Sequence, residues 1–155
     1  MFRIYRDTRF SKDKSPFKPA VGAQFPHKAR NTGRSVPGFY LHLEPRRCVG
    51  GGGIYRPDAA ALARIRERMV GKPKEWEVVR RKRIPIEGET LKRPPRGYDP
   101  DHRFVEDLKR KDLYSMSTFS QREVCQPDFL ATYVDACSRA APLVQFLTKA
   151  LSLQW

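Results

Sequence analysis

The sequence predicts an α+β fold, with an antiparallel sheet from the N-terminal half packed against helices from the C-terminal half. Residues 1–56 contain short segments in which apolar and polar side chains alternate, a pattern typical of strands. After residue 57 the apolar side chains recur with helical spacing. The chain has 155 residues, of which 39% are hydrophobic, and this is enough for one core. We therefore treat residues 1–155 as a single domain.

The clearest predicted strand is Gly38–Glu44. Its aromatic and aliphatic residues Phe39, Leu41 and Leu43 alternate with polar residues, so that Tyr40, His42 and Glu44 share the opposite face. We expect this strand to form an antiparallel hairpin with residues 49–56 through the turn 45–48. Two further strands are expected at Phe2–Arg6 and Ala20–Phe25.

Helices are expected to follow the hairpin. Pro57 and Asp58 favour a helix start, and Gly71 favours its end. The later segments are expected to be a helix at 74–82, a short strand at 84–91, a short helix from Asp99, an extended piece at 113–119 and a helix at 127–153. We expect that last helix to break before Pro142, because proline lacks the N–H that continues a helix.

Basic residues dominate the charge of the chain. Thirty-one Lys and Arg against 17 Asp and Glu give a net charge of +14, which predicts non-specific binding of nucleic acid at low salt. The three cysteines show neither disulfide nor zinc-site spacing, and we expect no metal and no cofactor. The sequence contains no signal peptide and no run long enough to cross a membrane, so we expect a cytoplasmic protein without membrane contact.

The first candidate site is the basic run that extends from residue 3 to residue 18. Arg6, Arg9 and Lys14 are expected to bind an anion, with Asp7 orienting the arginines. The aromatic residues in and beside this run should hold it against a core. The alternative is an internal ion-pair network that only stabilises the loop.

Three other segments offer candidate residues. On the Gly38–Glu44 strand, His42 has a side chain suited to acid–base chemistry and Tyr40 lies beside it, although both are also ordinary residues of a half-exposed strand. The glycine run 50–53 fits neither phosphate-loop nor dinucleotide-binding spacing, so Arg56 is the better ligand contact there. Two prolines stiffen the loop that carries Lys92, which either binds a ligand or is a surface charge.

Several motifs together give the chain a family resemblance, and the matching segments are residues 2–18, 38–45, 49–57 and 91–102. In these segments the sequence resembles the bacterial and fungal family known as domain of unknown function 2461, over essentially its whole length. The resemblance implies no established activity, cofactor or substrate. Members of that family carry some sixty to seventy further residues, largely helical, ahead of the first motif. The resemblance therefore implies a chain that lacks this segment, and self-association through the surface that the segment would cover.

From these observations we expect binding of a phosphorylated or other anionic ligand at a basic, aromatic-lined face. The residues expected to contact it are Arg6, Asp7, Arg9, Lys14, Tyr40, Arg56 and Lys92. One alternative is an enzyme that uses His42 as acid or base on a phosphorylated substrate. Another is a structural or nucleic-acid-interacting domain.

Overall fold

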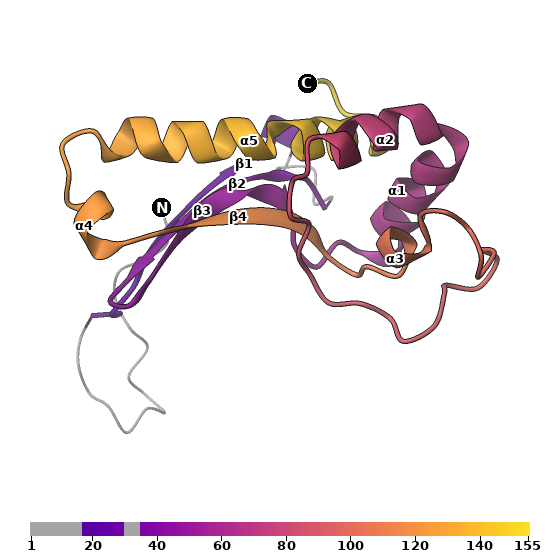
Figure 1. The fold of residues 1–155 in the computed structure, drawn as a ribbon, viewed down its shortest axis with the longest axis horizontal. Helices are drawn as coiled ribbons and strands as arrows, with labels where there is room; N and C mark the ends of the chain where they lie inside the picture. Colours follow the sequence, from indigo (N-terminus) through magenta and orange to yellow (C-terminus); the bar gives the residue numbers. More distant parts are fainter. Residues whose placement is uncertain (1–16, 30–34) are drawn as a thin grey trace.

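The computed structural model describes residues 17–29 and 35–155, and its centre is a four-stranded antiparallel sheet (Figure 1). The strands follow the chain in the order β1-β2-β3-β4, each paired with the next. They are β1 (Val21–Pro26), β2 (Gly38–Glu44), β3 (Arg47–Ile54) and β4 (Leu113–Phe119). The α+β prediction is confirmed, and the late strand β4 completes the sheet. The predicted strand Phe2–Arg6 lies outside the described residues.

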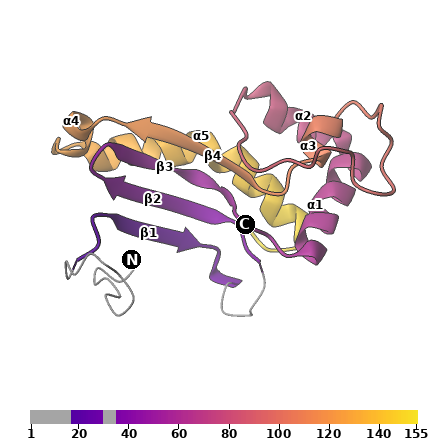
Figure 2. The same cartoon turned by 90° about the horizontal axis from the view of Figure 1, so that it is seen from below.

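Five helices lie in the described part of the chain. They are α1 (Ala59–Gly71), α2 (Pro73–Arg81), α3 (Val105–Leu108), α4 (Gln121–Val124) and α5 (Phe129–Ala150). Helix α5 runs along one face of the sheet, whereas α1, α2 and α3 form a block beyond its end (Figures 1 and 2). Asp58 caps α1, since its carboxylate accepts a hydrogen bond from the amide of Ala61 at 2.8 Å.

Three predicted details are wrong. The helix expected from Asp99 begins only at Val105, because the Asp99 carboxylate accepts the amide of Asp101 in a local turn instead of starting a helix. Helix α5 continues through Pro142, because burial of Ala140 and Leu143 on either side of the proline holds the helix together against the loss of one hydrogen bond. The expected strand at 84–91 is reduced to two isolated bridges. Pro85 lacks an N–H, and Gly88 has a φ of 133° that a continuous strand does not allow.

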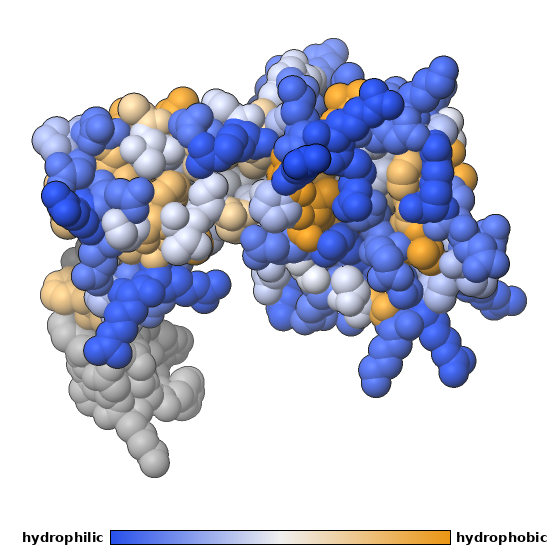
Figure 3. Space-filling model, in the orientation of Figure 1, coloured by the Kyte–Doolittle hydropathy of each residue, from blue (hydrophilic) through white to orange (hydrophobic). Residues whose placement is uncertain are grey.

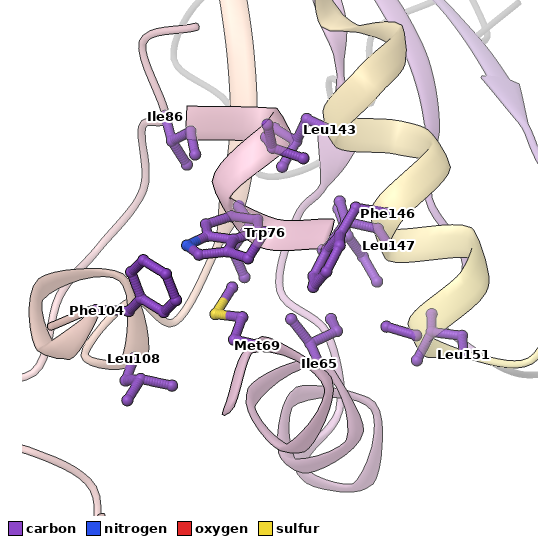
Figure 4. Close-up of a cluster of buried hydrophobic side chains, with 14 of the residues drawn as sticks. Ile65, Met69, Trp76, Ile86, Phe104, Leu108, Leu143, Phe146, Leu147 and Leu151 are labelled. Atoms are coloured by element: carbon purple, nitrogen blue, oxygen red, sulfur yellow. The ribbon is translucent and has the colours of Figure 1, made fainter. Parts of the chain in front are cut away.

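The larger core joins α5 to the helical block, and Trp76 lies at its centre (Figure 4). The centroid of its indole ring lies 4.8 Å from the centroid of the Phe146 phenyl ring. The indole Nε1–H donates a hydrogen bond to the carboxylate of Asp107 at 2.9 Å. Asp107 is only 4% exposed and also pairs with Arg80 at 3.3 Å. This arrangement gives the buried carboxylate the partners that it needs. Hydrophilic side chains cover much of the visible outer surface of the block (Figure 3).

A smaller core lies between the sheet and the first half of α5. It contains Cys48, Phe119, Tyr133 and Ala136. Beside it, Leu130 and Val134 of α5 are 72% and 52% exposed and lie one helical turn apart. These two side chains are apolar surface of the kind that self-association would use, and the expectation of self-association stays a prediction.

The glycine run of β3 allows close packing on two sides. A Cβ added at Gly52 would lie 2.7 Å from the Phe39 ring and 2.8 Å from Val144 of α5. A Cβ added at Gly51 would overlap the carbonyl oxygen of Ser115 in β4. Glycine is therefore needed at these positions of β3, because helix α5 and strand β4 approach its backbone too closely for a side chain.

Replacing Gly51 with alanine should destabilise the protein strongly. The added methyl group meets a backbone carbonyl, which cannot move without breaking the β3–β4 ladder, so we expect a loss of about 3 kcal/mol or more in the free energy of unfolding. The matched control is Gly71→Ala, at a position with nothing within 4 Å, which should change stability by less than about 1 kcal/mol. Urea denaturation measures both, and equal effects would contradict the packing argument.

Candidate functional site

No helix of the described part covers the face of the sheet opposite α5 (Figure 2). Strand register places polar and aromatic side chains in rows across this face. One row is Gln24, Tyr40, Gly51 and Met116, and the next is Gly22, His42, Val49 and Thr118. A concavity of about 690 Å³ lies on this face, within the size range of small-molecule sites. We call it the open-face site.

Three side chains of β2 form a hydrogen-bonded chain that starts in the open-face site, which Tyr40 and His42 line. The hydroxyl of Tyr40 lies 3.2 Å from Nδ1 of His42, and Nε2 of His42 lies 3.1 Å from Oε2 of Glu44. The His42 side chain is 20% exposed and that of Glu44 is 35% exposed. Because an ionised carboxylate only accepts, neutral His42 carries its proton on Nε2 and accepts from Tyr40 at Nδ1. The chain can therefore pass a proton from the phenol to an imidazole oriented by a carboxylate.

The residues Tyr55, Glu87 and Tyr114 also line the open-face site, where β3 ends and β4 begins near the helical block. The rings of Tyr55 and Tyr114 meet edge to face, with centroids 6.1 Å apart. Burial raises the pKa of Tyr114 above its ordinary value, and the nearby charge of Glu87 raises that pKa further. Arg47, which also lines the site, lowers the pKa of Tyr114. Arg47 therefore acts electrostatically on Tyr114 across the concave face.

The predicted site residues that lie in the described part of the chain separate into two groups. Tyr40 and His42 line the open-face site, whereas Arg56 and Lys92 do not. The guanidinium of Arg56 lies 5.4 Å from the ring centre of Tyr55, so it contacts the site only through that ring. The predicted residues Arg6, Asp7, Arg9 and Lys14 lie outside the described residues.

Sequence reasoning missed Arg47, Tyr55, Glu87 and Tyr114. Arg47 was assigned to the hairpin turn, but β3 begins there and pairs it with Glu44. Glu87 reaches the sheet through one bridge, in which its amide donates to the carbonyl of Tyr114 at 2.7 Å. The alternation within residues 113–119 would have placed Tyr114 on the same face as Met116 and Thr118. Pairing of this late strand with β3, however, has no local sequence signal.

A buried carboxylate fixes the rim of the open-face site. Asp112 is 4% exposed, and its two oxygens accept from the amides of Arg56 at 2.7 Å and Glu89 at 3.2 Å. It thereby connects the end of β3 to the segment that carries Glu87. Within residues 17–29 and 35–155, no cluster of His, Cys, Asp and Glu could hold a metal ion. No helix in that same part is long and apolar enough to span a membrane.

Two charge-removing variants should move the pKa of Tyr114 in opposite directions. Arg47→Gln should raise it, because a nearby cation favours tyrosinate, and Glu87→Gln should lower it, because a nearby anion opposes tyrosinate. NMR titration of ¹³C-labelled tyrosine measures both shifts. Lys92→Gln is the control and should leave the pKa unchanged, since Lys92 does not line the site. Shifts of the same sign would contradict the described arrangement.

Comparison with known proteins identifies a family. No curated protein and no solved structure matches the chain. The family model described as conserved hypothetical protein, DUF2461, matches residues 1–146. Because this match spans nearly the whole sequence, the chain belongs to the DUF2461 family of conserved hypothetical proteins.

Proposed function

We propose that the open-face site binds a small anionic ligand, with phosphorylated metabolites as the favoured class. The observation that carries the proposal is the convergence of Tyr40, His42 and Arg47 on one concavity. Arginine offers a planar, bidentate donor group for phosphate or carboxylate. The net charge of +14 favours the approach of anions to any exposed face.

The two ends of the site suit different parts of one ligand. Arg47 provides a cation, whereas the Tyr55–Tyr114 pair provides aromatic surface. A ligand with an anionic group and an apolar or ring portion would use both ends. Arg6, Arg9 and Lys14, with Asp7 orienting them, stay in the proposal as further anion contacts, on the strength of the sequence alone.

Removing the charge of Arg47 should weaken anion binding. We expect Arg47→Gln to reduce the affinity for a stabilising phosphorylated compound at least tenfold, because hydrogen bonds to charged groups contribute about 1.5–3 kcal/mol. Thermal-shift measurements with inorganic phosphate, sugar phosphates and nucleotides first identify the compound, and titration calorimetry then measures its affinity.

The matched control is Lys92→Gln, which removes one positive charge outside the site. If anion binding depended only on net charge, both variants would lose affinity equally. That result, or the absence of stabilisation by every compound in the screen, would contradict the proposal.

The hydrogen-bonded chain Tyr40–His42–Glu44 favours acid–base catalysis as a second candidate function. In this proposal the Tyr40 oxygen takes a proton from the bound ligand while its own proton passes to Nδ1 of His42. Glu44 accepts a hydrogen bond from Nε2 of that ring and stabilises the imidazolium that forms. The alternative without catalysis is a chain that only fixes the ligand-binding face.

Changing His42 should separate binding from turnover. If the chain transfers protons, His42→Gln should keep affinity for the identified ligand within about threefold and reduce its conversion at least a hundredfold. Incubation of ligand with protein, followed by ¹H and ³¹P NMR, detects the product. Tyr40→Phe should have the same effect on conversion. No conversion by the unaltered protein would leave ligand binding as the function and eliminate catalysis of that compound.

A further inference from the structure

The outer edge of β4 is paired only in part within residues 17–29 and 35–155. The amide of Glu87 donates to the carbonyl of Tyr114, and the amide of Tyr114 points back at the carbonyl of Glu87, 3.4 Å away. The backbone groups of Tyr114 are therefore directed away from β3. Since these directions alternate along a strand, the backbone groups of Met116 and Thr118 also point outward.

The outward groups of Met116 and Thr118 have no backbone partner among the described residues. The segment that meets β4 at Glu87 cannot continue alongside it, because Pro85 lacks the N–H that the next bridge would require. Arg83, two residues earlier, has a φ of 51°, which turns the chain away from an extended course. The strand edge at Met116 and Thr118 therefore offers two donors and two acceptors.

A cleft of about 520 Å³ runs beside this edge, and we call it the β4 cleft. Its walls are residues 82–85 on one side and the outer flank of α5 on the other, and its floor includes Ser115, Met116 and Ser117. Arg139 of α5 leans over this floor, since its guanidinium lies 3.4 Å from the hydroxyl of Ser117. A strand added to β4 would direct alternate side chains into the cleft.

The charges of the cleft select the kind of partner. Lys82, Arg83 and Arg139 supply three cations, and Asp135, which pairs with Arg139, supplies one anion. A second copy of this chain would bring its own excess of positive charge to the same edge, which opposes self-pairing there. We infer that the β4 edge binds an extended acidic peptide of about five residues, which adds a fifth strand to the sheet. This inference does not depend on the proposed function of the open-face site.

The test uses a synthetic peptide of alternating threonine and glutamate, added to the ¹⁵N-labelled full chain at physiological ionic strength. We expect saturable binding, with slowed hydrogen exchange at the amides of Met116 and Thr118. An analogue with methylated backbone nitrogens cannot donate to β4 and should bind at least tenfold more weakly. A threonine–lysine peptide should not bind, because it lacks the acidic side chains.

Two protein variants locate the interaction. Thr118→Pro removes one outward donor at a position where an edge strand tolerates proline, and it should weaken binding about five- to tenfold relative to Thr118→Val. Arg139→Glu should abolish binding, whereas Lys149→Glu, the same charge change farther along α5, should not. Thermal melts confirm that each variant is folded.

Three results would overturn the inference. They are no binding of the acidic peptide at millimolar concentration, equal binding of the methylated analogue, and binding without protection of Met116 and Thr118. Protection of both amides in the free protein, together with dimers in sedimentation, would assign the edge to a second copy instead.

Discussion

Strand β3 has glycine at four successive positions. Helix α5 can therefore pack directly against the β3 backbone, and the paired strand β4 can lie close to the same backbone. A larger side chain at Gly50 would meet the ring of Tyr133, and one at Gly52 would meet Val144. This close packing determines which surface remains for a ligand. One face of the sheet is committed to α5, so the opposite face carries the polar side chains of β2 and the open-face site.

Two buried carboxylates connect segments that are far apart in the sequence by accepting hydrogen bonds from both. Asp107 holds the indole of Trp76 and pairs with Arg80 within the helical block, while Asp112 accepts amides from both Arg56 and Glu89. Each acidic side chain is satisfied by partners more than twenty residues away in the sequence. Removing such partners leaves an unpaired buried group, which is among the most costly changes in a core.

The sequence was sufficient to predict an element and its exposed face where the pattern is local. The alternation in residues 38–44 predicts both the strand and the shared face of Tyr40 and His42, and the structure brings these two side chains to one concavity. Prediction from the sequence failed where contacts between distant segments determine the structure. The positions of Tyr114 and Glu87 depend on the pairing of β4 with β3, which lie far apart in the sequence. The continuity of α5 through Pro142 depends on burial that no local pattern reveals. Arg56 was expected in a strand, but its φ of 46° and its bond to Asp112 place it beyond the strand end.

Pro142 also divides α5 mechanically. The first half of the helix, including Tyr133 and Ala136, belongs to the small core on the sheet, and the second half, including Leu143 and Leu147, belongs to the core of the helical block. At the junction the proline removes one rung of the helical hydrogen-bond ladder, and such positions are where helices bend. Bending motions that rock the sheet against the helical block should therefore concentrate at this residue. The bend would then lie between the two cores, so that each half of α5 keeps its own core contacts.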